Sequence, residues 1–556
     1  MSTDNQGTDE VRNRLLRRAD WRFLLPDASP ARTVCFVEGE LALATELLSQ
    51  RVSEGEAVAS GDCDLAIAVD PDAATLRSAW AALRPGGACY TEWSGVGPMG
   101  PPAIRQRLLR MGFESVACFA PWPRPARRLP SAWVPLEIGG ALRYLVARKG
   151  VARSWTQRLL EGVRRTGWAV RTWLGVGSPI CAIARKPFSA TAQPGDPAPH
   201  ADCLDDIRDQ WENWGLGPRP SALSWLLLTG GRRSINKVVR LIFAGSDQPW
   251  LVLKMPRIAE ATAGLRREGQ VLHELQTTGR AIGGMPKLLF QGLRAGVPTI
   301  IETALLGVPL STRLSRDTYR DLALQGTDWL VALASGAEVL PPSAWQSRLV
   351  DSTVRRFEAE FGSVVDPALI RESANVLATL GPVPMVCEQR DFSPWNLFIG
   401  SDKELQVLDW ESAEPQGLPM MDLVYFTTYL SFYLERARTP DRYRGCYRET
   451  LQASTFTGSV RKQCEEQYAE RVGVPRTDIG PLRLLCWMLH SHSEYQQFST
   501  GVVGVPGPAQ LRRSLFLSLW EEELQALLQL GPLGSSFSYK AQPASTATHA
   551  GGTGNV

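Results

Sequence analysis

The sequence predicts a two-part chain that joins an α/β region to an α+β region. In the first third, short apolar strands alternate with helical segments, as at residues 62–70 and 73–83, and this rhythm is typical of a parallel sheet covered by helices. From about residue 220, strands follow one another closely and a long helical stretch comes after them. Residues 187–202 are rich in Pro, Ala, Ser and Gly and predict a linker.

We expect five segments along the 556 residues. They are a disordered or helical lead (1–19), a sheet domain (20–187), the linker (188–203), a larger domain (204–533) with lobes at about 220–303 and 311–533, and a disordered tail (534–556). The first ten residues and the tail are polar and poor in large apolar side chains, so disorder is expected at both ends.

The sheet domain begins with a strand at 33–37, followed by the strand and helix named above. A turn at 84–92 enters a third strand, and the apolar segments 145–149 and 180–186 predict late strands.

The turn at residues 83–87, LRPGG, resembles a turn of class I S-adenosylmethionine-dependent methyltransferases. Such enzymes place a glycine-rich turn after the first strand so that the cofactor can lie against the backbone, but the segment 37–41, VEGEL, holds one glycine. About twenty-five residues separate the first strand from the next, too few for the usual extra helix, strand and ribose-binding acid. We therefore expect a shrunken, Rossmann-like domain without methyltransferase activity.

The most informative stretch is residues 386–410, VCEQRDFSPWNLFIGSDKELQVLDW. An apolar segment delivers Asp391 into a loop, Asn396 follows five residues later, and a predicted hairpin returns to Asp409. Phosphoryl transfer needs a carboxylate that accepts the proton of the attacking hydroxyl, and an amide oxygen and a second carboxylate that hold magnesium. We expect Asp391 to be that base and Asn396 and Asp409 to be the metal ligands. The alternative is a surface turn that these residues merely cap.

A glycine pair, Gly230 and Gly231, begins the turn between predicted strands at 226–229 and 238–243. Glycines let backbone N–H groups approach phosphate oxygens closely, and Ser234 or Asn236 could add a side-chain donor. The alternative is a plain hairpin.

A third strand at 251–254 ends on Lys254, and a helix is predicted at 265–275. A lysine in an apolar run is usually an edge residue whose ammonium reaches water. A strand at 297–303 and a connecting segment at 304–310 follow.

Together these segments resemble the aminoglycoside phosphotransferase and choline kinase-like family, relatives of protein kinases with the motif His-x-Asp-x-x-x-x-Asn followed by a strand and Asp. Gln389, Asp391, Asn396 and Asp409 stand at those positions. The resemblance covers about residues 220–430, including GLPMMDL at 417–423, and implies a bilobal protein-kinase-like fold that uses ATP and Mg²⁺ and binds adenine at the segment 304–310.

The resemblance also implies that Lys254 binds phosphate and is oriented by Glu268, with Glu274 as the alternative partner. Gln389 departs from the family's His, but glutamine can also donate and accept hydrogen bonds and brace the loop. Asp422 is expected either to anchor the backbone of this loop or Arg390, or to start a helix.

Composition limits the partners. A net charge of +3 without a long basic run gives nucleic acid and anionic membranes little support. The 10 scattered cysteines suggest reduced thiols. The start lacks a signal peptide and no apolar run approaches the roughly 18 residues of a membrane span, so a cytoplasmic protein is expected.

We therefore expect an ATP-dependent phosphotransferase acting on a hydroxyl of a small molecule such as an amino sugar, a sugar, or a choline-like or nucleoside-like acceptor. A protein kinase fits less well because DWE at 409–411 replaces Asp-Phe-Gly. The open alternatives are a nucleotide-binding scaffold and a bifunctional methyltransferase-kinase. Trp395 could contact the acceptor, and Glu435 and Glu494 could meet a cationic one or lie on a solvated helix face. No oligomeric state is predicted.

Overall fold

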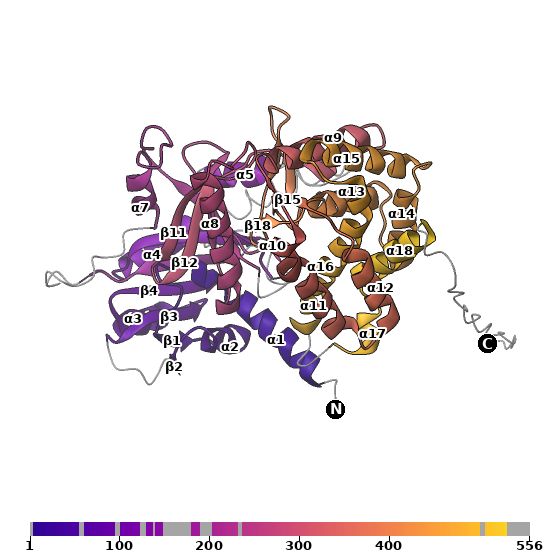
Figure 1. The fold of residues 1–556 in the computed structure, drawn as a ribbon. Coiled ribbons are helices and arrows are strands. Elements are labelled where there is room, and N and C mark those ends of the chain that lie inside the picture. Colours follow the sequence, from indigo (N-terminus) through magenta and orange to yellow (C-terminus); the bar gives the residue numbers. More distant parts are fainter. Residues whose placement is uncertain are drawn as a thin grey trace, which may run out of the picture.

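The structure is a computed structural model that describes residues 4–54, 61–94, 100–122, 129–136, 140–147, 179–188, 203–231, 236–500 and 506–530. Strands gather on one side of the molecule and most of the helices on the other (Figure 1). Within the described residues, one large sheet has twelve strands and two small sheets have three strands each. The fold is therefore of mixed α/β type.

Seven strands form the N-terminal part of the large sheet. They are β1 (Arg32–Phe36), β2 (Arg51–Glu54), β3 (Cys63–Val69), β4 (Leu83–Trp93), β5 (Glu114–Trp122), β6 (Ala132–Pro135) and β7 (Ile180–Arg185). β2, β1, β3 and β4 lie side by side in that order and are parallel, whereas β7 is antiparallel to both of its neighbours, β4 and β5. The predicted parallel pairing is thus confirmed for β1, β3 and β4. The expectation that too few residues separate the first two predicted strands for an extra helix and strand is wrong, because Glu40–Glu46 form a helix and Arg51–Glu54 form β2 there. The sheet as a whole is mixed.

Helices accompany these strands. They are α1 (Asp4–Arg18), the 3-10 helix η1 (Asp20–Leu24), α2 (Glu40–Glu46), α3 (Ala73–Ala82), α4 (Pro101–Arg110) and α5 (Gly140–Ala147). Of the two expectations for the lead, disordered or helical, the helical one is observed from Asp4 onward. α1 is held to the sheet because Arg18 near its end pairs with Glu92 of β4 at 2.6 Å.

Two further predictions for this half are corrected. Residues 145–147 belong to α5 and not to a strand, because so short an apolar run fits either period; residues 148 and 149 lie outside the described residues. The turn predicted at 84–87 is part of β4. There Gly86 takes a φ of +77° and its N–H donates to the carbonyl of Lys186 at 3.0 Å, so the backbone stays paired through the glycines.

Five antiparallel strands extend the same sheet. They are β8 (Ser224–Leu228), β9 (Val238–Phe243), β10 (Pro249–Met255), β11 (Leu288–Arg294) and β12 (Val297–Thr303), with α7 (Cys203–Gln210), η2 (Ala259–Ala261) and α8 (Thr262–Thr277) beside them in sequence. β6 pairs with β8, with Trp133 opposite Leu227, so the sheet continues from the first half into the second. The predicted linker falls almost entirely outside the described residues.

A buried ion pair crosses this joint. Asp20 and Arg257 lie 2.9 Å apart and both side chains are fully buried. Arg240 of β9 donates to the carbonyl of Phe23, and Arg22 donates to the carbonyl of Arg257. The segment that precedes the first strand is therefore built into the strands around the glycine turn.

The remaining helices and short strands form the C-terminal region. The helices are η3 (Leu310–Thr312), α9 (Tyr319–Leu333), α10 (Pro342–Gln346), the π-helix η4 (Ser347–Asp351), α11 (Ser352–Phe361), α12 (Pro367–Leu377), α13 (Met421–Leu434), α14 (Pro440–Leu451), α15 (Phe456–Val472), η5 (Arg476–Asp478), α16 (Ile479–Thr500), α17 (Pro508–Leu511) and α18 (Leu515–Leu530). The small sheets are β13 (Val308–Pro309) with β16 (Leu397–Ile399) and β17 (Leu405–Val407), and β14 (Glu338–Leu340) with β15 (Val383–Glu388) and β18 (Glu414–Gly417).

One apolar core fills this region and anchors the candidate site. Phe392 and Trp410, each next to a predicted site residue, are fully buried in it together with Leu272 and Leu275 of α8. Burying large aromatic side chains stabilises a fold by a few kcal/mol each, typically about 1.5–3. The loops that carry Asp391 and Asp409 are thus fixed by their neighbours.

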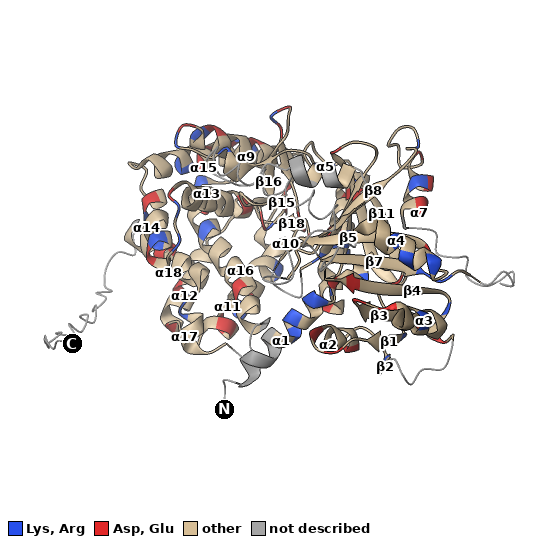
Figure 2. Ribbon diagram, turned by 180° about the vertical axis from the view of Figure 1, so that it is seen from behind, with Lys and Arg blue, Asp and Glu red and all other residues tan. Residues whose placement is uncertain are grey.

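No helix in the described part of the chain is both long enough and apolar enough to cross a bilayer. Acidic and basic residues are interspersed over both halves (Figure 2).

Candidate active site

The turn between β8 and β9 opens the site. Gly231 has a φ of +89°, and a Cβ atom on it would lie 2.5 Å from the side chain of Asn236, so glycine suits this position. Arg257 donates to the carbonyl oxygen of Gly230 at 3.4 Å. Ser234, the predicted side-chain donor, lies outside the described residues.

Lys254 meets two carboxylates. Its Nζ lies 2.6 Å from Glu268 on α8 and 2.7 Å from Glu302 on β12. The structure therefore brings Lys254 and Glu268 together as the sequence predicted. Glu302 was missed, although an acid within the apolar strand 297–303 was a signal that could have pointed to it.

Burial and charge act against each other in this cluster. Burial by itself would lower the pKa of Lys254, but Glu268 and Glu302 raise it above its ordinary value. Burial would raise the pKa of Glu268, but Lys237 and Lys254 hold it below its usual range. Burial, helped by Glu268, raises the pKa of Glu302. The pKa values of the two carboxylates are therefore shifted in opposite directions.

A second lysine, Lys237, reaches the same place from the end of the glycine turn. Its Nζ lies 2.6 Å from Asp409, 2.8 Å from Glu268 and 3.1 Å from Glu411. Burial would lower the pKa of Lys237, but these carboxylates, Glu268 first, raise it well above its ordinary value. Lys237 was not among the site residues predicted from the sequence. Its place at the foot of a glycine turn, directly before a strand, was the available signal.

The loop after β15 presents Asp391. Its Oδ2 accepts a hydrogen bond from Asn396 Nδ2 at 2.7 Å, and the same nitrogen donates to the Asp391 carbonyl at 3.1 Å. Burial, followed by the charge of Asp409, raises the pKa of Asp391 to about 7, although the bond from Asn396 opposes this rise. With its nitrogen committed to Asp391, Asn396 has its amide oxygen left for a cation.

Gln389 braces this loop from within the core. Its side-chain nitrogen donates to the carbonyls of Leu408 at 3.0 Å and Asp409 at 2.5 Å, and its side-chain oxygen accepts from Asp391 N–H at 2.8 Å. Gln389 is fully buried. It ties the backbone of the predicted base to the backbone of the predicted metal ligand, so the bracing expected of this position is present.

Asp422, at the start of α13, holds the other side of the loop. Its two oxygens accept from the N–H groups of Gln389 at 2.6 Å and Arg390 at 2.7 Å. Burial, followed by the charge of Glu388, raises the pKa of Asp422 to about 7. Asp422 therefore both anchors the backbone of the loop and stands in the first turn of a helix, so both readings left open for it are observed.

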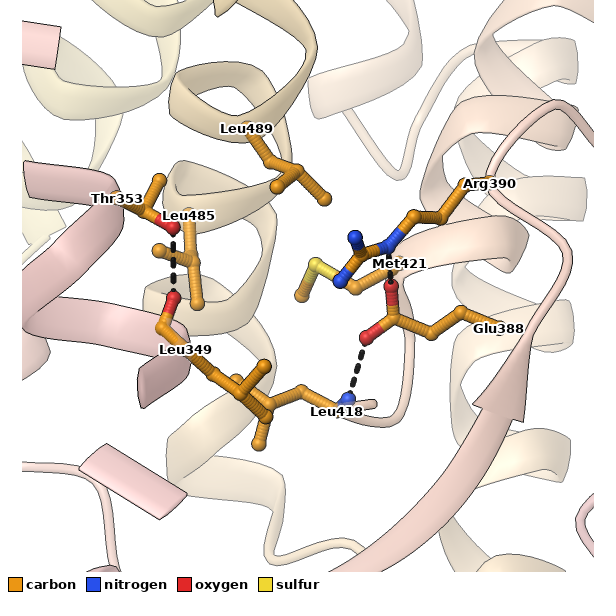
Figure 3. A pocket seen from close by; sticks show the side chains of 8 residues that line it. All are labelled: Leu349, Thr353, Glu388, Arg390, Leu418, Met421, Leu485 and Leu489. Atoms are coloured by element: carbon orange, nitrogen blue, oxygen red, sulfur yellow. Dashed lines mark hydrogen bonds and ion pairs between the residues drawn. The ribbon is translucent and has the colours of Figure 1, made fainter. Parts of the chain in front are cut away.

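A small pocket lies behind the loop (Figure 3). Arg390 Nε donates to Glu388 at 2.6 Å there, and Glu388 also accepts from Leu418 N–H. The lining consists of leucines and a few other side chains: Leu349, Thr353, Glu388, Arg390, Leu418, Met421, Leu485 and Leu489. Arg390 has a φ of +65°, and its side chain lines this pocket, whereas the neighbouring Asp391 belongs to the candidate site. The ion pair between Arg390 and Glu388 holds the loop on this side.

Asp409 follows β17 with a φ of +63°. The next residue, Trp410, donates its N–H to Glu268 at 3.2 Å, so the carboxylate that orients Lys254 also fixes the segment with Asp409. Asp409 and Glu411 keep exposed fractions of 35% and 40%, which leaves them open to a ligand.

The residues fit a divalent cation by charge and by donor type. Two lysines, 237 and 254, pair with four carboxylates, and the charges of Asp409 and Glu411 also act on Asp391. The four carboxylates are Asp409, Glu411, Glu268 and Glu302. Carboxylate and amide oxygens are the donors that Mg²⁺ prefers. Among the described residues, no three His, Cys, Asp or Glu side chains form a complete metal cage, so Asp409 and Asn396 would share the ion with phosphate oxygens and water.

Aromatic side chains border the loop on the other side. Trp395, 40% exposed, meets Tyr429 edge to face with ring centroids 5.0 Å apart and lies 6.2 Å from Tyr433. Tyr425 stacks on His490 at 4.1 Å below them. The tyrosines lie one helical turn apart on α13 and form an aromatic wall beside Asp391.

The acidic residues considered for a cationic acceptor are placed differently from that role. Glu494 accepts from Ser514 Oγ and from the N–H groups of Leu515 and Phe516, so it caps the start of α18. Glu435 ends α13, where its N–H donates to the carbonyl of Ser431. Glu494 is therefore a structural carboxylate.

In the N-terminal half, η1 packs an aromatic side chain onto the sheet. Its strand order reverses between β1 and β3, where open α/β sheets bind ligands outside the carboxyl ends of the strands. Towards the end of β4, next to β3, Trp21 stacks on Tyr90 with centroids 4.1 Å apart, and both are fully buried. Arg18 pairs with Glu92 beside them. α1 and η1 thus pack their own side chains against this edge.

Comparisons with known proteins are limited to structure. No protein-family model and no curated protein matches this chain. Among solved structures, a thermostable mutant of aminoglycoside phosphotransferase APH(4)-Ia in ternary complex with ADP and hygromycin B is 12% identical. The match covers 57% of this chain and 97% of that one, with a TM-score of 0.34.

Two further structures give similar values. The GDP and kanamycin complex of APH(2")-IIIa is 13% identical, with 57% of this chain and 98% of that one covered and a TM-score of 0.34. Aminoglycoside phosphotransferase APH(3'')-Id from Streptomyces rimosus is 16% identical, with 52% and 99% covered and a TM-score of 0.30. Each of these matches covers just over half of this chain.

Proposed function

We propose that this chain is an ATP-dependent phosphotransferase that moves the γ-phosphate of ATP to a hydroxyl group of a small molecule. The observation that carries the proposal is the convergence of four separate segments on one partly open cluster. β10 supplies Lys254, α8 supplies Glu268, and the loops after β15 and β17 supply Asp391 with Asn396 and Asp409. An ion-pair network that served stability alone would not require more carboxylates than lysines.

Each group has a role that its surroundings allow. Asp391 accepts the proton of the acceptor hydroxyl, and a pKa raised to about 7 suits a base that works near neutral pH. Asn396 holds Asp391 in place through its amide nitrogen. Lys254, kept charged by Glu268, holds phosphate oxygens.

Magnesium would be held by Asp409 and the amide oxygen of Asn396, where it would neutralise charge on the phosphates. Gln389 keeps the two loops at a constant separation. Gly230 and Gly231 leave space for phosphate oxygens beside the backbone.

One observation favours a second candidate. Lys237 neutralises Asp409, the predicted metal ligand, at 2.6 Å. A protein that had lost catalysis could keep this contact permanently and bind nucleotide without turning it over. A nucleotide-binding scaffold is therefore the alternative to be tested.

The test uses the full chain with ATP, Mg²⁺ and a panel of amino sugars, choline and nucleosides. ADP release and the mass of the phosphorylated product are measured together. We expect equal amounts of ADP and product with at least one acceptor. ATP binding without ADP release, for any acceptor and for water, would replace this proposal by the scaffold.

A further inference from the structure

The two lysines of the site are held in different ways. The partners of Lys254, Glu268 and Glu302, have exposed fractions of 0% and 1%. Lys237 shares Glu268, but its other partners are Asp409 and Glu411, which are 35% and 40% exposed. Lys254 is a fixed cation, whereas Lys237 can exchange its partners with solvent or with a ligand.

Lys237 also stands where an incoming cation would bind. Its ammonium contacts Oδ1 of Asp409 at 2.6 Å, which is the carboxylate best placed to hold Mg²⁺. Metal–oxygen distances for Mg²⁺ are about 2.0–2.1 Å. An ammonium and a divalent cation on the same carboxylate would repel each other strongly at such short range.

From this geometry we infer that Lys237 is a tethered cation that competes with Mg²⁺ for Asp409. In the nucleotide-free protein it neutralises Asp409 and Glu411, which would otherwise repel each other. When nucleotide and metal arrive, Lys237 leaves Asp409 and turns to the phosphates, because Glu268 still holds it beside the glycine turn. The inference rests on the proposed function, since it concerns the metal step of that reaction.

In this arrangement, the affinity of the protein for metal depends on whether nucleotide is bound. Metal alone must displace Lys237 without compensation, whereas metal with nucleotide supplies phosphate oxygens as new partners for the ammonium. The parent should therefore bind metal weakly alone and far more tightly in the presence of ATP. Such reciprocal tightening is the mark of a coupling between two ligands.

The experiment measures Mn²⁺ binding to the full chain by electron paramagnetic resonance, with and without ATP. Lys237→Met removes the charge and keeps the length of the side chain. Without nucleotide it should bind Mn²⁺ at least ~10-fold more tightly than the parent, a change equivalent to ~1.4 kcal/mol. Lys237→Arg keeps the charge and should bind Mn²⁺ as weakly as the parent.

Two additional variants keep the test decisive. Lys237→Gln can still donate a hydrogen bond to Asp409, so it protects the fold if the methionine variant is unstable, and it should also tighten Mn²⁺ binding. Lys403→Met should leave the nucleotide-free affinity within ~3-fold of the parent, because Lys403 is exposed on the turn between β16 and β17; a ~3-fold change is ~0.6 kcal/mol.

The two possible failures are distinct. Unchanged Mn²⁺ affinity in folded Lys237→Met and Lys237→Gln would overturn this inference even if the parent phosphorylates an acceptor. Tighter Mn²⁺ binding in both variants would uphold it, because the measurement needs no turnover. Absence of turnover in the parent would count against the proposed function alone.

Discussion

The ion pairs near the end of β4 are shielded from solvent, whereas the cluster around Lys254 and Asp409 contains carboxylates that are partly open. In the first region Arg18 pairs with Glu92, and Asp20 pairs with Arg257 in full burial. In the second, lysines 237 and 254 share four carboxylates, two of which are partly exposed. Removing one partner of a buried ion pair leaves an uncompensated charge, while carboxylates that are partly open have capacity for a ligand.

The same contrast extends to the space beside the charges. Trp21 of η1 and Tyr90 of β4 stack on each other and are fully buried, so neither ring is open to a ligand. Beside Asp391, by contrast, Trp395 keeps 40% of its surface exposed. We therefore propose a structural role for the N-terminal half, joined through β6 and β8 to the strands that carry the glycine turn.

The largest expected effect is the loss of activity when Asp409, in the partly open cluster, is changed. Asp409→Asn removes the charge that would hold Mg²⁺, and ADP release should fall to the background of the assay while the melting temperature stays near that of the parent. Asp402→Asn, on the exposed hairpin turn before β17, is the matched control and should keep full activity. Parent-like rates in Asp409→Asn would remove Asp409 from the metal site.

Breaking the buried ion pair between Asp20 and Arg257 should lower the free energy of unfolding. Asp20→Ala leaves Arg257 buried without its carboxylate, which typically costs about 3–5 kcal/mol, and denaturant unfolding measures the loss. Arg14→Met breaks the exposed pair between Arg14 and Glu40 and should change the free energy of unfolding by less than about 0.5 kcal/mol. If the two variants are equally stable, the ion pair does not hold the joint.

His490, which stacks on Tyr425 beside the site, is a buried titratable group whose effect on stability can be measured. Burial, followed by Arg390, lowers its pKa to about 3, against about 6.5 in an unfolded chain. Between those values the unfolded chain takes up a proton that the native protein refuses, so stability falls as pH falls below about 6.5. From pH 6.5 to pH 5 the loss from this group is about 2 kcal/mol.

The check is the free energy of unfolding measured by denaturant at each pH. His490→Gln should have a shallower pH dependence than the parent, whatever its stability at neutral pH. His273→Gln, on the exposed face of α8, should keep the slope of the parent. Parallel curves for the parent and His490→Gln would contradict the burial of a neutral imidazole.

The last prediction is an absence of S-adenosylmethionine binding. Calorimetric titration of the full chain with S-adenosylmethionine at micromolar concentrations should give no binding heat, because the segment 37–41 lacks the glycine-rich turn. Saturable binding would break the comparison and return the bifunctional methyltransferase-kinase to consideration.

Local pattern was enough to predict most strands that carry the site. The apolar runs at 238–243 and 297–303 match β9 and β12 to the residue, and the spacing of apolar residues on α8 placed Glu268 on a helix. The loop from Asp391 to Asp409 was predicted because its residue types and spacing follow the chemistry of phosphate and metal.

Long-range neighbours were beyond reach of the sequence. Lys237 and Glu302 have no local pattern that distinguishes them, since their meaning comes from Asp409 and Lys254 lying beside them. The pairing of β6 with β8 joins strands about ninety residues apart, and periodicity does not say which edges meet. α5 was predicted as a strand because a short apolar run fits both periods.

The central claim is that Asp391 acts on the acceptor and not on the nucleotide. Asp391→Asn should bind ATP with Mg²⁺ nearly as well as the parent, measured by calorimetry, yet release ADP at least ~100-fold more slowly with an active acceptor, as expected when a general base is lost. If Asp391→Asn turns over ATP and acceptor at the parent's rate, the account of this site as a phosphotransferase centre is contradicted.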